Sequence, residues 1–444
     1  MADRPASTTH FSSAIMILLA LTAANVMGYA ARNALFSAYA DLRVRFLVDD
    51  ADLGLLTTAF MAGQALVTVP VGWAGDRFGR KPVLVAGVAL AGLAGCFGAF
   101  STGAAMLAAT RALVGIGCAS IVPIANSILS QLFDGPKKAS RIAVFNVGMF
   151  VGGGLGFAGG ASPGYPWVLL IIGVPTLGVA LVISRLRIPV AAAVDNASPT
   201  ITMARVGAEI PKLSGKQPLR PLRYVWTAVV EAAQGAARVL RLPAVPWLVA
   251  SATVMAFAAG GLQSWLVEFL KREKHMTEGQ ANGLLITAMF GALAGVVVGA
   301  RVGDRWRARA RAGLAKTIAL ALALAAPMLA LCIVIPPGPG LSIAAVIGMF
   351  FLSWYHAPLA ATVDDLVPAE QSVTAQAVVV FAMHLLGTAP ASWVVGLMSK
   401  RHNLTSAMWL PVTSIAVSAV LMLITARVMR SVPLANQQRP MNDP

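Results

Sequence analysis

The chain has 444 residues, of which 57% are hydrophobic and only 12% are charged. Because soluble domains carry about 25% charged residues, this composition excludes a water-soluble fold and indicates an integral membrane protein. The net charge of +16 does not predict nucleic-acid binding, since the Lys and Arg residues flank apolar stretches and form no separate basic domain.

Twelve apolar stretches are long enough to cross a bilayer as helices, for which about 20 residues are needed. The first is predicted to stay in the protein, because it lacks a signal-peptide cleavage pattern. The predicted spans are 12–38, 52–75, 82–100, 104–132, 139–160, 165–186, 245–270, 278–302, 314–336, 341–364, 373–397 and 404–428.

A charged turn follows both the second and the eighth span. It reads Gly75-Asp76-Arg77 in the first half and Gly303-Asp304-Arg305 in the second. This repeat predicts an all-α membrane protein of twelve transmembrane helices in two pseudo-symmetric six-helix bundles, 1–186 and 245–444. The polar linker 187–244 joins them. Its stretch 221–242 fits an amphipathic helix on the membrane surface or a disordered basic segment equally well.

The distribution of Lys and Arg predicts the orientation, because these residues accumulate on the cytoplasmic side. With both termini inside, most basic residues face the cytoplasm, and both Gly-Asp-Arg turns do too. We expect the protein to lie in the inner (plasma) membrane of a bacterium. The few basic residues then left outside are Arg43, Arg45, Lys271, Arg272, Lys274, Lys400 and Arg401.

The repeated turn resembles the signature loop of the major facilitator superfamily, and residues 111–117 match its Arg-x-x-x-Gly-x-Gly motif. The stretches 53–60 and 358–377 look like the spinster and anion:cation symporter groups. The stretch 261–270 looks like the seventh helix of spinster proteins, a group associated with lysolipids and sphingolipid phosphates. The resemblance implies a monomeric transporter that works by alternating access, without a cofactor or a metal.

Two acids that the resemblance leads us to expect are absent. These relatives typically have Asp before the first-helix Arg, where this chain has Ala31 before Arg32. They also typically have Glu at the position of Cys118. Those carboxylates are the expected proton carriers, so the sequence favours facilitated diffusion or anion exchange. Glu268, in the last outer turn of its span, is the nearest exception.

Arg32 and Arg111 lie well inside spans, where a charge is costly and normally faces a cavity. Asn25 and Tyr29 share a helix face with Arg32, as Cys118 does with Arg111. If both faces line the central cavity, they predict a site for an organic anion, because guanidinium groups bind phosphate and carboxylate bidentately. Snorkelling to the headgroups or a structural role is the alternative.

Three polar side chains extend the predicted substrate site into the second half: Gln263, His356 and His384. A mid-membrane histidine can donate to an anion or titrate near neutral pH. The alternative is a histidine bonded to neighbouring backbone or to a hydroxyl group.

Charged residues at the inner ends of spans predict a cytoplasmic gate of ion pairs that must break as the carrier turns inward. The predicted gate residues are Asp76, Arg77, Arg80, Asp304, Arg305, Asp364 and Asp365.

The sequence therefore predicts a secondary-active or facilitative transporter of an organic anion, with lysophospholipid-like substrates ahead of small sugar acids. A proton-coupled symporter with His384 or Asp364 as carrier is the first alternative. A drug:proton efflux pump is another, suggested by glycines that recur every four residues from Gly148 to Gly160. The same spacing also allows close helix packing.

A non-transporting receptor would need an appended cytoplasmic domain, and the sequence shows none. No Walker-type loop or hydrolase motif is present, so neither an ATP-driven pump nor an enzyme is predicted.

Overall fold

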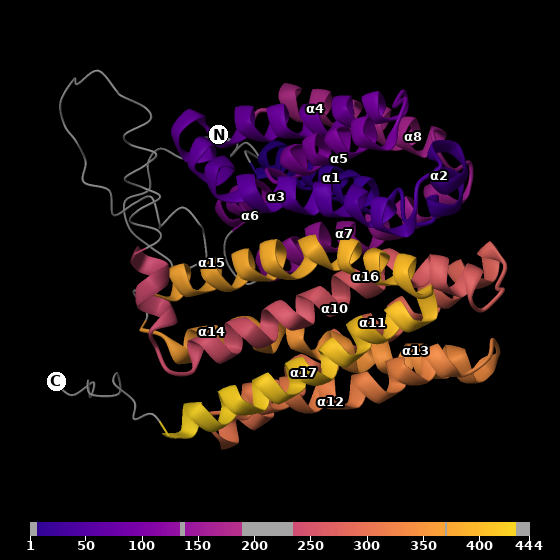
Figure 1. Cartoon of the computed structure of the whole chain (residues 1–444). Helices are drawn as coiled ribbons and strands as arrows, with labels where there is room; N and C mark the ends of the chain where they lie inside the picture. The colour runs from indigo at the N-terminus through magenta and orange to yellow at the C-terminus, as the bar shows by residue number, and fades with distance from the viewer. Residues whose placement is uncertain (1–6, 134–137, 189–233, 369–370, 432–444) are drawn as a thin grey trace, which may run out of the picture. The chain divides into compact units, whose positions relative to one another are not determined.

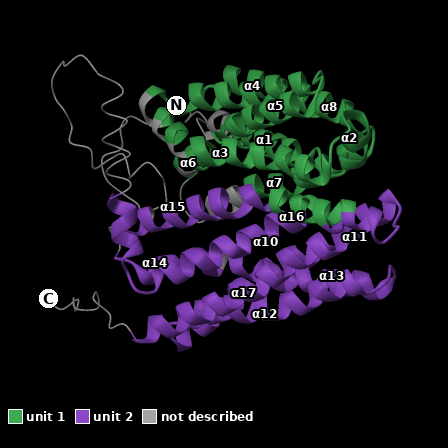
Figure 2. Cartoon of the chain, in the orientation of Figure 1, with its two compact units in different colours: residues 1–207, 264–268, 392–401 green, residues 208–263, 269–391, 402–444 purple. Residues whose placement is uncertain are grey.

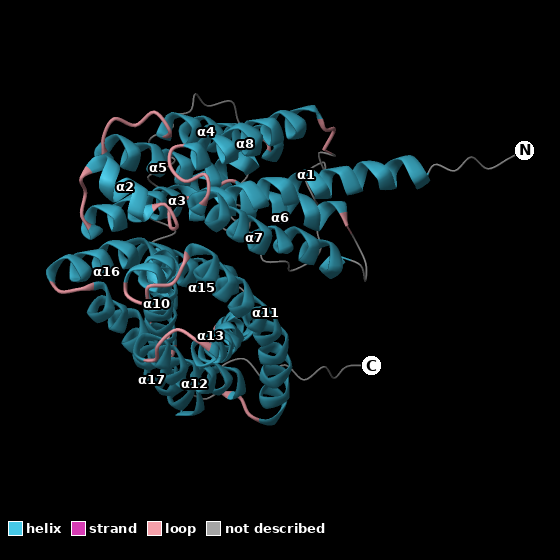
Figure 3. Cartoon of the chain, turned by 90° about the vertical axis from the view of Figure 1, so that its right-hand side faces the viewer, coloured by secondary structure: helices cyan, strands magenta, loops and turns pink. Residues whose placement is uncertain are grey.

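The structure is a computed structural model that describes residues 7–133, 138–188, 234–368 and 371–431. All regular structure in these ranges is helical, as Figure 3 shows, which confirms the all-α fold class. Most of the predicted amphipathic stretch 221–242 lies outside the described residues, although 234–240 are helical.

The helices divide between two compact units (Figures 1 and 2). The first unit comprises 1–207, 264–268 and 392–401, and the second comprises 208–263, 269–391 and 402–444. In the first half of the chain the helices are α1 (Ser7–Asn33), α2 (Tyr39–Phe46), α3 (Asp50–Phe78), α4 (Arg80–Gly98), α5 (Ala104–Cys118), α6 (Ile121–Leu132), α7 (Lys138–Ala161) and α8 (Trp167–Arg185). In the second half they are α10 (Val245–Arg272), α11 (Glu278–Arg309), α12 (Gly313–Val334), α13 (Pro339–Leu352), α14 (His356–Leu366), α15 (Ser372–Ala382), α16 (Ala389–Arg401) and α17 (Leu404–Ser431).

Eleven helical stretches in the described part of the chain are long and apolar enough to cross a membrane. The remaining predicted span, 52–75, lies in α3, which is one continuous helix of 29 residues. Length and hydropathy therefore agree with a multi-pass bundle.

Three of the predicted spans are interrupted, which hydropathy did not predict. The interruptions lie at 119–120, at the 3₁₀ turn 353–355 and at the π-helical segment 383–388. Each comes shortly before a proline, which has no N–H to donate to the carbonyl four residues earlier. The prolines are Pro123, Pro358 and Pro390.

The helices pair in a way that repeats between the two halves. In the first unit α3 packs on α5 and α4 packs on α8, and in the second unit α11 packs on α13 and α12 packs on α17. A shift of six spans converts one set of pairs into the other. The repeated pairing is the structural counterpart of the repeated charged turn.

Glycines allow the backbones of paired helices to approach closely. Gly115 of α5 lies against the carbonyl of Phe60 in α3, and Gly295 of α11 lies against the carbonyl of Phe350 in α13. A side chain at either glycine would collide with that carbonyl.

The glycine spacing on α7 is explained by its packing against α1. These glycines face backbone of α1 or, for Gly160, of the turn that follows it, so the stripe serves close packing. Gly152, Gly156 and Gly160 lie against the carbonyl oxygens of Val26, Ala30 and Ala34, respectively.

Candidate functional site

A pocket in the first unit brings together residues of α1, α3 and α5. Asn25, Tyr29 and Arg32 line it together with Cys118, as their helical spacing predicts. Gln64 of α3 also lines it and was missed, because no charge or spacing signal distinguishes it from other polar residues in the spans. Arg32 is the only charged side chain among the described residues that line this pocket.

The helix α1 presents Arg32 from its last turn. The guanidinium carbon lies 5.9 Å from the centre of the Tyr29 ring, one turn earlier. Asn25 is buried, and its amide nitrogen donates to the carbonyl oxygen of Phe145 in α7 over 2.9 Å. That bond fixes the rotation of α1 about its axis, and therefore the face on which Arg32 stands.

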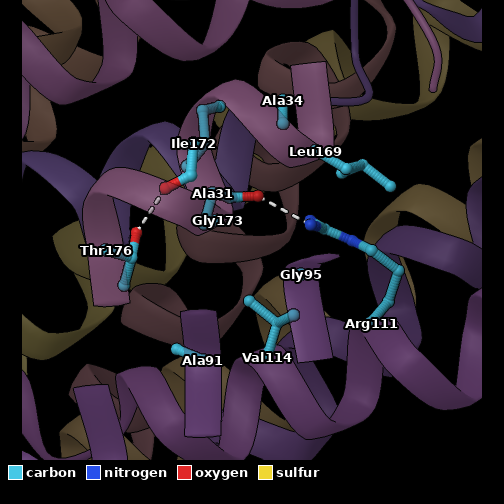
Figure 4. Close-up of a pocket in the computed structure, with 10 residues that line it drawn as sticks. All are labelled: Ala31, Ala34, Ala91, Gly95, Arg111, Val114, Leu169, Ile172, Gly173 and Thr176. Atoms are coloured by element: carbon cyan, nitrogen blue, oxygen red, sulfur yellow. Dashed lines mark hydrogen bonds between the residues drawn. The ribbon is translucent and has the colours of Figure 1, made fainter. Parts of the chain in front are cut away.

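Arg111 is bonded to the end of α1 (Figure 4). One terminal nitrogen donates to the carbonyl oxygen of Ala31 at 2.7 Å, the bond drawn in Figure 4. The other donates to the carbonyl oxygen of Arg32 at 3.0 Å. Its side chain is buried, with the guanidinium 4.8 Å from the centre of the Phe60 ring. The last carbonyls of a helix have no intrahelical partner and carry partial negative charge. These contacts favour the structural alternative for Arg111.

The predicted site residues of the second half belong to the second unit. His384 lies in the π-helical segment, with Nδ1 3.4 Å from the hydroxyl oxygen of Thr388. His356 is exposed, and its ring stacks on that of Tyr355 at 4.1 Å between centres. Gln263 lies on α10. Their role in substrate binding stays a prediction.

Part of the predicted gate forms contacts in the second unit. Asp365 pairs with Arg307 at 2.5 Å, and Asp364 accepts hydrogen bonds from Ser372 at 2.5 Å and Gln376 at 3.1 Å. Arg307 was not named by the sequence analysis, although it lies two residues beyond the Gly-Asp-Arg turn.

The other predicted gate residues lie near the ends of α3, α4 and α11. Asp304 and Arg305 are exposed near the end of α11, and Arg80 is half-buried at the start of α4. The side chains of Asp76 and Arg77 lie outside the described part of the structure. The gating role stays a prediction.

A buried group of charged residues in the first unit was not predicted. Arg43 of α2 donates to a carboxylate oxygen of Asp50 at 2.6 Å and of Glu268 at 2.9 Å. The hydroxyl of Ser399 donates to the second oxygen of Asp50 at 2.5 Å. We call these four residues the Arg43 cluster. Nothing in their positions along the sequence links them.

The described residues contain no group of three or more His, Cys, Asp or Glu side chains that could hold a metal ion. The Arg32 pocket offers a guanidinium, a phenol and two amides beside apolar surface, a combination that suits an anionic group attached to an apolar body.

The chain is similar in sequence to a family of known proteins. The family model described as Major Facilitator Superfamily matches residues 21–392. The zebrafish (Danio rerio) protein spinster homolog 3 is 26% identical over 87% of this chain and 77% of its own length. The human protein spinster homolog 1 is 27% identical over 87% of this chain and 73% of its own length.

A similar solved structure is that of a bacterial homologue of the human lysosomal transporter Spinster, in an inward-facing and unoccupied conformation. It has a TM-score of 0.70 and 20% sequence identity, and the match covers 94% of this chain and 96% of that one. At this identity the likeness establishes the fold alone.

Proposed function

Since the chain belongs to the major facilitator superfamily, we propose that it is an alternating-access transporter of an organic anion, with single-chain phospholipids of the lysophospholipid kind ahead of small sugar acids. Its multi-pass membrane fold and its similarity to spinster proteins support transport. We place it in a bacterial plasma membrane as a monomer with both termini in the cytoplasm, in accordance with the distribution of Lys and Arg.

The observation that carries the substrate class is the Arg32 pocket. Its described lining includes one guanidinium and no carboxylate, and Tyr29, Gln64 and Asn25 provide further polar contacts. A guanidinium in a low-dielectric site binds phosphate or carboxylate through paired hydrogen bonds. The apolar lining residues, among them Phe60 and Ile121, suit an acyl chain better than a sugar ring.

For the mechanism we favour facilitated diffusion or anion exchange. Ala31 and Cys118 occupy the positions at which similar transporters typically carry acids, and the described lining of the Arg32 pocket lacks a carboxylate. Accumulation in proteoliposomes that collapsed with a proton uncoupler, and returned with an imposed proton gradient, would contradict this mechanism.

The substrate class is tested by binding to the purified protein in detergent. Lysophosphatidate and a monoacylglycerol with the same acyl chain differ only in the phosphate, so we expect the lysophosphatidate to raise the melting temperature more. Arg32→Ala should weaken lysophosphatidate binding about tenfold or more, since a charge-assisted contact is lost, while the monoacylglycerol should bind as before.

Arg430→Ala is the matched control, because Arg430 is exposed in the last turn of α17. It should leave both ligands unaffected. An equal loss of both ligands in Arg32→Ala would make Arg32 a structural residue. An unmodified protein that did not distinguish the two lipids would contradict the anion proposal itself.

A further inference from the structure

The Arg43 cluster joins three parts of the chain that are far apart in sequence. Arg43 and Asp50 belong to α2 and the first turn of α3, Glu268 to α10, and Ser399 to α16. All four belong to the first unit, which includes 264–268 and 392–401 from the second half of the chain. A single guanidinium therefore holds a helix of the second half against two helices of the first.

The burial of the two carboxylates makes the cluster sensitive to the loss of its cation. Asp50 is 5% exposed and Glu268 is 4% exposed, whereas the side chain of Arg43 is 31% exposed. A buried ion pair adds little net stability, but removing one partner is strongly destabilising, because it leaves an uncompensated charge. Without Arg43, two carboxylates would face each other in a low-dielectric site.

The contacts around the cluster are close. Trp265 is fully buried, donates from Nε1 to the carbonyl oxygen of Ser392 over 2.9 Å, and lies 5.1 Å from Tyr39 between ring centres. Gly396 of α16 lies directly against the backbone carbonyl of Asp50, so a larger residue would not fit there. The segments are therefore held together by backbone contact as well as by charge.

The two carboxylates differ in how they are tied to Arg43. Asp50 is seven residues from Arg43 and lies in the first turn of α3, where the helix N-terminus favours negative charge. Glu268 is 225 residues away and lies near the C-terminal end of α10. A helix C-terminus carries partial negative charge, so it does not stabilise this carboxylate. If the segments parted, Arg43 would therefore stay with Asp50 and leave Glu268.

We propose that Arg43 is a gating residue of this transporter, and that the Arg43 cluster is a latch that holds 264–268 and 392–401 against α2 and α3 and opens once in each transport cycle. The latch rests on alternating access and not on the substrate class. The bonds from Arg43 to Glu268 and from Ser399 to Asp50 are the ones that break, while the bond from Arg43 to Asp50 persists in both states.

A spin-label distance measurement tests the latch without any substrate. The labels are placed by Val44→Cys and Arg401→Cys, two exposed positions outside the cluster, in a protein whose three cysteines are replaced. In the parent we expect one dominant short distance. Arg43→Gln should add a major population at longer distance, with the closed-to-open ratio reduced about tenfold or more.

Two further variants separate charge from general disruption. The first variant combines Arg43→Gln, Asp50→Asn and Glu268→Gln. It removes the unpaired charges, so most molecules should again show the short distance between the labels. Lys400→Gln is the control, because Lys400 pairs with Asp49 at the exposed rim, where ion pairs contribute little. It should leave the distances unchanged.

Arg43→Gln with the parent's distance distribution would overturn the latch, whatever the binding experiment on Arg32 gives. So would a triple variant as open as Arg43→Gln, since closure would then not depend on the charges. If Arg43→Gln does not yield a monodisperse protein, Arg43→Lys takes its place. A single ammonium cannot pair with both carboxylates as the guanidinium does, so a smaller shift in the same direction is expected, and no shift would overturn the proposal.

Discussion

Two arginines in the first unit have different surroundings. Arg32 lines the pocket with Tyr29 and Gln64, whereas Arg111 lines another pocket, drawn in Figure 4, and donates two hydrogen bonds to the last turn of the helix that carries Arg32. Arg111 thereby holds the end of α1 in place, and with it the side chain that we propose as the anion ligand. We therefore propose Arg32 as the ligand and Arg111 as a positioning residue.

Arg111→Gln should reveal this division. It removes both hydrogen bonds to α1, so we expect a loss of about 2–3 kcal/mol in unfolding free energy, seen as a lower melting temperature without ligand. Arg32→Gln should lower that temperature less than Arg111→Gln does, but should weaken lysophosphatidate binding. Equal stability of the two variants would contradict a positioning role for Arg111.

The sequence predicted which residues share a face of α1 better than it predicted their contacts. Helical spacing correctly placed Asn25, Tyr29 and Arg32 on one face, because that spacing is a property of a single helix. It could not predict that Arg111 bonds to backbone carbonyls of α1, which depend on how two helices pack. The partners of Glu268 were out of reach for the same reason.

At the scale of the helices, hydropathy located the spans but not their internal breaks. Apolar composition continues through 383–388, although the hydrogen-bond pattern there is π-helical. Proline is a partial signal: Pro123, Pro358 and Pro390 follow breaks, yet Pro175 and Pro327 lie inside unbroken helices. Whether a proline breaks a helix depends on what neighbouring helices provide to the freed carbonyl.

The contact between α1 and α7 can be tested with two glycines on one helix. A Cβ at Gly152 would collide with the carbonyl oxygen of Val26, whereas one at Gly154 meets nothing within 4 Å. Gly152→Ala should lower the unfolding free energy by about 1–3 kcal/mol through overpacking, and Gly154→Ala should be neutral or slightly stabilising. Thermal unfolding of both variants measures this. Equal effects would mean that the close approach of the two helices does not limit residue size.

At the scale of the whole molecule, the repeated charged turn predicted the duplicated architecture, and the repeated pairing of helices agrees with it. The family was within reach of the sequence because its motifs are local. The orientation in the membrane rests on the Lys and Arg distribution alone.

Cysteine labelling in intact cells tests that orientation. Val44→Cys, on the predicted outer side, should react with a membrane-impermeant maleimide, and Arg309→Cys, beyond the second Gly-Asp-Arg turn, should react only after the membrane is broken. Both positions are exposed, so access and not burial decides the result. The reverse pattern would invert the orientation and place the predicted gate on the outside.

The close approach of α3 to α5 limits which residues each helix can carry. Gly115 of α5 accommodates the carbonyl of Phe60, and Gly63 of α3 accommodates that of Ala112, while in the second half Gly295 of α11 accommodates that of Phe350. Either helix of a pair can therefore provide the small residue, and a designer who redraws such a contact is free to choose which one.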